Sequence, residues 1–385
     1  MDYINSNHFF NLIYEKKIFY SYTTLPNQFS TISQTYISWS NFLSFKNMKY
    51  SKLLPEIKKD NIFISNHAGI IKAINISSGK EIWIKNLSIN NANPRLSGGI
   101  GISCSEIDHI YIGSEYGTVY ALDIKNGELI WQQKLLGKIF SIPKSTQYGL
   151  LIIYTNNGFV QALNEIDGSI QWTIQVYDNI FNMLSYNIFD VKIFSDKIIL
   201  INNKKEVMAI SIYDGEILWK TAIETNSENK NATNYTNKKI NFIVIDDKAY
   251  ISFENGYLIC INLVSGKIVW INKSIYALKI LNDKKNLYAI DQNKQIIAIN
   301  LYTGKNIWIY SDKLIKINYE NVDLNKKYFI YLDNRKYLYW IDIQNQKHIK
   351  TEKINIKGSV YFFKILKNRL IIISNYGNIY SFNII

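Results

Sequence analysis

The sequence is poor in the residues that characterise several protein classes. Of its 385 residues only four are proline and 18 are glycine, which argues against a disordered or collagen-like chain. No run of 18 apolar residues occurs, so the sequence predicts no membrane-spanning helix. Hydrophobic residues make up 47% of the chain, which is enough for a sizeable core.

Cysteine and histidine are also scarce. The two cysteines, Cys104 and Cys260, fall in different sequence repeats and in apolar surroundings, so we expect two buried thiols and no disulfide. The four histidines are far apart and show no metal-ligand spacing. No grouping of residues indicates a catalytic, cofactor or metal site, and we expect none.

Positive charge exceeds negative charge, with a formal net charge of +13. The lysines are scattered, with short pairs such as Lys16 and Lys17, and no dense basic run appears. We therefore favour solvated surface lysines over the other reading of a basic chain, a partner that carries phosphates or an acidic surface.

The first residues do not have the features of a signal peptide. Their most apolar stretch, Phe9–Tyr14, is short, contains an asparagine and is flanked by Asp2 and Glu15. We divide the chain into an N-terminal extension, residues 1–30, which we expect to be poorly ordered, and one β-domain, residues 31–385.

A short motif recurs along the chain. In segments such as NGELIW a tryptophan follows a glycine by four residues, and a triplet such as ALN precedes the glycine. The tryptophans of this motif are 38 to 51 residues apart, a period typical of propeller blades. They are Trp83, Trp131, Trp172, Trp219, Trp270 and Trp308.

Each repeat predicts short strands joined by tight turns. Residues His109–Ser114 are rich in β-formers, and the motif glycine can adopt a positive φ in the last turn of the repeat. Periodicity of helical length is absent, so the sequence predicts an all-β chain. A tryptophan on the outermost strand would fill the groove against the next blade and contribute about 2–3 kcal/mol. Recurrence in six units favours this structural role over a ligand pocket lined by the rings.

A seventh repeat is degenerate. Residues Arg335–Lys350 keep the register of the motif but have Gln346 at the glycine position and Lys350 at the tryptophan position. We therefore expect a weaker junction after this blade.

The two ends of the chain complete an eighth unit. Residues Gly377–Ile385 form a third strand with no fourth strand after it, whereas Tyr36–Phe42 carries Trp39 with no blade before it. If the two segments pair, no sheet edge is left open. The sequence thus predicts an eight-bladed β-propeller whose ring is closed by the N-terminal strand.

The recurring unit resembles the pyrroloquinoline-quinone-like propeller repeat. Within that group, Arg95–Leu135 and Thr155–Val176 are very similar to the BamB family of outer-membrane-protein assembly lipoproteins, and Leu25–Phe29 resembles the segment before the family's first strand. The resemblance implies a non-catalytic scaffold on the periplasmic face of the outer membrane, peripherally associated with it, that binds the periplasmic repeats of BamA in the Bam complex. The family's signal peptide and anchoring cysteine are not visible here; a late annotated start, a decayed signal and a dispensable anchor all stay open.

The family contacts BamA through two neighbouring loops, one with a Leu-x-Leu-Arg run and one with an Asp-x-Asp pair. The corresponding residues of this sequence are Phe181, Met183, Leu184, Asn237 and Lys239. Leu184 stands at the arginine position, and Asn237 and Lys239 stand at the acidic positions. The resemblance therefore implies an interface in which the apolar anchors Phe181 and Met183 supply much of the affinity.

Three other functions compete with this hypothesis. Quinone-dependent dehydrogenases share the propeller, but the chain lacks their adjacent cysteines, and its acidic residues mostly occur singly in turns, as Asp167 and Asp214 do. A single-stranded nucleic-acid binder would use basic grooves and stacking rings, yet these aromatics follow strand periodicity and indicate a core. An interaction propeller with a changed partner is the more serious alternative.

Overall fold

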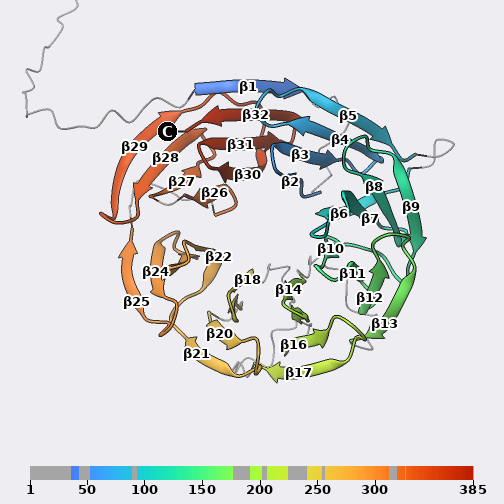
Figure 1. Ribbon diagram of the computed structural model, residues 1–385. Helices are drawn as coiled ribbons and strands as arrows, with labels where there is room; N and C mark the ends of the chain where they lie inside the picture. Colours follow the sequence, from blue (N-terminus) through green and yellow to red (C-terminus); the bar gives the residue numbers. More distant parts are fainter. Residues whose placement is uncertain are drawn as a thin grey trace, which may run out of the picture.

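The chain folds into a closed ring of eight small β-sheets around a central axis (Figure 1). The computed structural model describes residues 36–42, 53–88, 93–176, 191–201, 206–223, 241–253, 256–311, 319–325 and 327–384. Every sheet has four antiparallel strands, so the prediction of an all-β, eight-bladed propeller is confirmed. No helix within these ranges is long and apolar enough to cross a membrane.

The first four sheets follow one another along the chain. Sheet 1 contains β2 (Glu56–Lys58), β3 (Asn61–Ser65), β4 (Ile70–Asn75) and β5 (Glu81–Asn86). Sheet 2 contains β6 (Leu96–Ile102), β7 (His109–Ser114), β8 (Thr118–Asp123) and β9 (Leu129–Lys134). Sheet 3 contains β10 (Lys144–Ser145), β11 (Leu150–Tyr154), β12 (Phe159–Asn164) and β13 (Ile170–Gln175). Sheet 4 contains β14 (Lys192–Phe194), β15 (Lys197–Ile201), β16 (Glu206–Ser211) and β17 (Ile217–Ala222).

The remaining sheets complete the ring. Sheet 5 contains β18 (Asn241–Ile245), β19 (Lys248–Ser252), β20 (Leu258–Asn262) and β21 (Ile268–Asn272). Sheet 6 contains β22 (Ala277–Asn282), β23 (Asn286–Asp291), β24 (Ile296–Asn300) and β25 (Asn306–Tyr310). Sheet 7 contains β26 (Val322–Leu324), β27 (Tyr328–Leu332), β28 (Tyr337–Asp342) and β29 (Lys347–Lys353). Sheet 8 contains β30 (Val360–Leu366), β31 (Arg369–Ser374), β32 (Asn378–Asn383) and β1 (Tyr36–Phe42).

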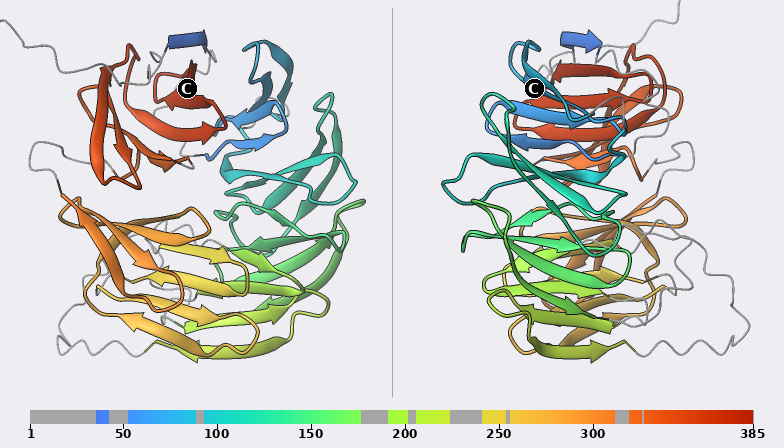
Figure 2. Two further views of the ribbon diagram at one scale, coloured as in Figure 1. Left: turned by 60° about the vertical axis from the view of Figure 1, so that its left-hand side comes forward. Right: turned by 90° about the vertical axis from the view of Figure 1, so that its right-hand side faces the viewer.

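The meander of each sheet gives the ring two distinct faces. Each sheet runs from a first strand at the axis to a fourth strand at the rim, and neighbouring strands are antiparallel (Figures 1 and 2). Turns from the first to the second and from the third to the fourth strand therefore lie on one face, which we call the hairpin face. Turns from the second to the third strand, and the segments that join successive sheets, lie on the other, the connection face.

The N-terminal strand lies beside the C-terminal one. β1 pairs with β32 along its length, with Tyr36 opposite Asn383 and Phe42 opposite Asn378. Since β32 runs toward the hairpin face, Tyr36 lies at that face. That this strand holds the ring closed in solution stays a prediction.

The core consists of apolar layers between neighbouring sheets. The second and third strands of each sheet are almost wholly buried, because both of their faces are covered by adjacent sheets. One layer, for example, joins Ile71 and Trp83 of sheet 1 to Ile100 and Ile112 of sheet 2. Strands buried on both faces therefore supply most of the apolar burial that stabilises the ring.

One of the two cysteines is not placed as predicted. Cys260 is buried in β20, but Cys104 is exposed in the loop that follows β6. Its strand-like sequence context was misleading because Ser103 and Ser105 bend the chain out of the sheet and bond to each other through their hydroxyls, 2.8 Å apart.

Candidate functional site

The junctions between sheets are built by the recurring tryptophans and glycines. The Nε1 of Trp83 donates a 3.0 Å hydrogen bond to the carbonyl of Ile124 in the next sheet. The same indole lies against Gly127, where a Cβ would come within 2.5 Å of the ring. Gly127 also has a φ of 73°, so a side chain is excluded there both by conformation and by the neighbouring ring.

The same contact recurs around the ring. Indole Nε1 groups donate to a carbonyl in the following sheet in four further pairs, Trp131–Glu165 (3.0 Å), Trp172–Ile212 (2.8 Å), Trp219–Leu263 (3.2 Å) and Trp270–Leu301 (3.0 Å). Trp308 packs against Tyr288, with ring centroids 5.9 Å apart, in a layer that includes Ile343 of sheet 7. The side chain of Trp39 lies outside the described part of the structure. Sequence reasoning assigned the glycine only to its turn and missed its contact with the preceding sheet.

In sheet 7 the tryptophan of the junction lies on the third strand instead of the fourth. Elsewhere a small residue on the third strand stands opposite the tryptophan, as Ala121 does opposite Trp131, and a bulge follows the pair. In sheet 7 Trp340 occupies the third strand and Lys350 stands opposite it. Trp340 is buried against sheet 8, and the Lys350 ammonium lies 4.9 Å from its ring centroid. The indole is thus retained at this junction, one strand closer to the axis.

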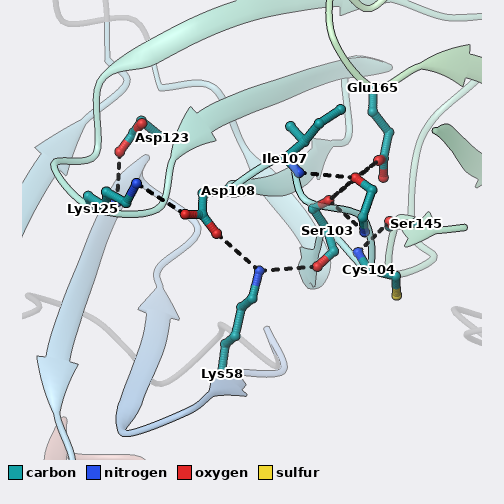
Figure 3. A network of polar contacts seen from close by, with 10 residues as sticks. Lys58, Ser103, Cys104, Ile107, Asp108, Asp123, Lys125, Ser145 and Glu165 are labelled. Carbon is teal, nitrogen blue, oxygen red and sulfur yellow. Dashed lines mark hydrogen bonds and ion pairs between the residues drawn. The ribbon is translucent and has the colours of Figure 1, made fainter. Parts of the chain in front are cut away.

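A buried carboxylate distinguishes the junction of sheets 2 and 3 (Figure 3). Glu165 stands where the other repeats have an isoleucine or leucine, and it is completely buried. Its Oε2 accepts hydrogen bonds from the Ser105 hydroxyl (2.8 Å) and the Ser103 hydroxyl (3.4 Å). Burial raises the pKa of the Glu165 carboxyl, and hydrogen bonds from Ser145, Ser105 and Ser103 oppose this increase.

Two buried oxygens of this cluster have no hydrogen-bond partner within the protein. They are the Oε1 of Glu165 and the hydroxyl of Tyr111, whose pKa is raised by burial and by the nearby carboxyl. An unsatisfied buried polar group costs about 1–3 kcal/mol. The junction of sheets 2 and 3 is therefore less stable at this cluster than an apolar junction would be.

The loop that carries Ser103 also borders a cleft of about 300 Å³ between sheets 1, 2 and 3. Lys58 holds this loop through the carbonyl of Ser103 (3.3 Å) and the carboxylate of Asp108 (3.5 Å), and Lys125 lowers the pKa of Asp108 through a second ion pair (Figure 3). The polar residues that line the cleft are Glu56, Lys58, Ser103, Cys104, Lys144 and Ser145.

The cleft is bounded by tightly packed strands. A Cβ at Gly101 would lie 2.1 Å from the carbonyl of Pro143 in sheet 3, so the run of glycines in β6 allows the neighbouring backbone to approach closely. Within the described ranges, no group of three or more acidic, histidine or cysteine side chains is placed to hold a metal ion.

All five predicted partner-binding residues lie outside the described residues. Phe181, Met183 and Leu184 belong to the segment between β13 and β14, and Asn237 and Lys239 to the segment between β17 and β18. The ends of both segments are described.

Both segments start and finish at the connection face, on the two sides of sheet 4. Val176 and Val191, which flank the first segment, are buried in the layer between sheets 3 and 4. Ile223 and Phe242, near the ends of the second, are buried in the layer between sheets 4 and 5. The fold thus buries the described ends of the two segments in the layers on the two sides of sheet 4.

Comparison with known proteins agrees with this architecture. The chain is 29% identical to outer membrane protein assembly factor BamB of Moranella endobia, over 82% of each chain. It is 32% identical to the protein of the same name from Vibrio cholerae, over 86% of this chain and 83% of that one. The crystal structure of BamB from Moraxella catarrhalis shares the fold, with a TM-score of 0.71 and 17% identity over 91% of this chain and all of that one. The family model described as outer membrane protein assembly factor BamB matches residues 67–310, and the chain therefore belongs to the BamB family of non-catalytic outer membrane protein assembly factors.

Proposed function

We propose that this chain is a scaffold subunit of the Bam complex on the periplasmic face of the outer membrane, where it binds the periplasmic repeats of BamA. Membership of the BamB family supports the role in outer membrane protein assembly. The position of the two predicted partner segments supports the mode of binding, because both leave the connection face beside sheet 4. A rigid ring can hold two such segments at a fixed separation, and BamA would be oriented by contact with both.

The contact depends mainly on apolar side chains. Phe181 and Met183 supply large apolar groups, and a few buried side chains of this kind usually carry most of the binding energy. Leu184 extends the apolar surface in place of an arginine. Asn237 and Lys239 replace an acidic pair, so the interface should depend on salt less than a charged one would.

A binding assay between the full chain and the periplasmic domain of BamA from the same organism tests this proposal. We expect the double variant Phe181→Ala/Met183→Ala to weaken binding about tenfold or more, which corresponds to about 1.4 kcal/mol or more. The control is Tyr213→Ser, an exposed change on the opposite face. An intact ring that shows no binding to BamA would refute the proposal and favour an interaction propeller with another partner.

A further inference from the structure

The hairpin turns of sheets 5 and 6 combine exposed apolar residues with lysines. Val264 and Tyr302 occupy the same position in the turns that follow β20 and β24, and 63% and 73% of their surfaces are exposed. In each turn a lysine, Lys267 or Lys305, follows three residues later and is also exposed.

Other sheets have different chemistry at these turns. Sheets 3 and 4 also expose apolar residues, Ile166 and Tyr213, but an aspartate follows each of them directly. Sheets 1 and 2 have Ser77 and Lys125 at this position. An exposed apolar residue together with a lysine and no acidic residue occurs, among the described turns of this kind, in sheets 5 and 6.

The surroundings of the two turns extend this character. Ile268, Val269 and Ile307 are exposed on the rim directly beyond the lysines. The neighbouring turn of sheet 6 adds two exposed lysines, Lys284 and Lys285.

Two of the three carboxylates in the neighbouring first turns of sheets 5 and 6, Asp283 and Asp247, are engaged within the protein, and the third, Asp246, is exposed. Asp283 accepts hydrogen bonds from the backbone amides of Lys285 (2.8 Å) and Asn286 (2.7 Å) and from the Tyr288 hydroxyl (2.7 Å). Asp247 forms an ion pair with Lys248 at 2.6 Å. Four exposed lysines thus outnumber the one exposed carboxylate, and the exposed charge at these turns is positive overall.

We propose that this part of the hairpin face docks directly on an anionic lipid surface. A turn that exposes one large apolar side chain can place it among lipid headgroups, and a tyrosine suits that depth because its ring is apolar and its hydroxyl is polar. The lysines reach back to the lipid phosphates, and each strengthens the attraction to an anionic surface. Separate apolar tips ringed by lysines fit a fluid headgroup layer better than a rigid protein surface, which would require a continuous apolar patch.

The opposite face is the one at which the two predicted partner segments leave the ring. With the hairpin face on the lipid, the connection face and its two predicted partner segments point away from the bilayer and stay accessible to BamA.

Sedimentation of the full chain with lipid vesicles tests the proposal. We expect binding to vesicles of phosphatidylcholine with about a quarter of phosphatidylglycerol and little binding to phosphatidylcholine alone. The variant Val264→Ser/Tyr302→Ser should reduce partitioning about tenfold, and Lys267→Gln/Lys305→Gln should reduce both partitioning and its dependence on salt. Circular dichroism reports whether each variant is folded.

Two controls locate the contact. Tyr376→Ser changes a tyrosine that is 60% exposed on the connection face, and a chain without residues 1–35 keeps all eight sheets. Both should bind vesicles as the unchanged chain does. The proposal is overturned if the truncated chain loses binding while the turn variants retain it, or if Tyr376→Ser is the variant that fails. It is also overturned if no vesicle binds and the turn variants instead weaken binding to BamA, which would assign the turns to a protein contact.

Discussion

The indole of Trp131 lies so close to Gly168 of the following sheet that a Cβ on this glycine would come within 2.5 Å of the ring. The spacing of glycine and tryptophan within one repeat therefore reflects a contact between two repeats. Five motif glycines receive the tryptophan of the preceding sheet in this way: Gly127, Gly168, Gly215, Gly266 and Gly304.

This contact predicts a large cost for an otherwise mild substitution. Gly168→Ala should lower the free energy of unfolding by about 2–4 kcal/mol, because it combines backbone strain at a φ of 75° with a collision against the indole. Urea unfolding followed by tryptophan fluorescence measures the change.

Gly149 provides the matched control. It has a φ of 72° but nothing within 4 Å of its Cβ position. Gly149→Ala should therefore cost only the backbone strain, about 1–2 kcal/mol. If the two variants lose the same free energy of unfolding, the indole moves aside without cost and its contact with the glycine is unimportant.

Sheet 7 predicts a stabilising substitution. Gln346 has a φ of 54°, a conformation that costs a residue with a Cβ about 1 kcal/mol. Gln346→Gly restores the glycine of the other repeats and should raise the free energy of unfolding by up to about 1 kcal/mol. Gln344→Gly, in the same turn, should lower it slightly through added chain entropy in the unfolded state; a gain from both changes would argue against relief of strain at Gln346.

The buried Glu165 predicts a dependence of stability on pH. Because burial raises the pKa of this carboxyl in the folded state, the folded protein binds its proton more tightly than the unfolded chain does. Its contribution to stability is then greatest at low pH and is lost as pH rises from the ordinary carboxyl range through the raised pKa. Glu165→Gln removes this loss and supplies an amide donor for the unsatisfied Tyr111 hydroxyl.

Urea unfolding of both proteins at acidic and at mildly alkaline pH measures the effect. The variant should gain about 1–2 kcal/mol over the unchanged protein at the higher pH, and less at the lower. Glu106→Gln, an exposed change in the adjoining loop, should show no such trend. If the difference in unfolding free energy between Glu165→Gln and the unchanged protein is the same at both pH values, Glu165 does not titrate between them.

The pairing of β1 with β32 predicts that the N-terminal strand stabilises the ring. Removing residues 1–42 deletes six cross-strand pairs, which contribute about 1–5 kcal/mol in total, and leaves the edge of β32 unpaired. Removing residues 1–35 should leave stability nearly unchanged. Urea unfolding together with size-exclusion chromatography tests both variants; equal stability of the two truncated chains would contradict a closing role for β1.

The sequence was sufficient to predict the strands and to place the tryptophans at the junctions between blades, but not to predict which residues they contact. The predicted segments His109–Ser114 and Tyr36–Phe42 coincide with β7 and β1, because alternation and turn residues are local properties. The contact of Trp131 with Gly168 joins two different repeats, and spacing along the chain does not show which surfaces meet.

Two further features carried a signal that sequence reasoning overlooked. Trp340 stands where six other repeats have alanine or cysteine, so the exchange with Lys350 was visible as an excess of volume at one position and a deficit at the other. Glu165 stands at an otherwise apolar position, but its turn-like context EIDG concealed that it is buried. The five predicted partner residues are known from resemblance alone and stay predictions.

The pairing of Tyr36 with Asn383 has a consequence for how the protein is made. Sheet 8 takes its outermost strand from the start of the chain and its other three from the end, so it can assemble only after synthesis is nearly complete. Until then β1 has no partner in its own sheet. A growing chain thus has to keep this strand from pairing with other edges, and a factor that shields it would speed productive folding.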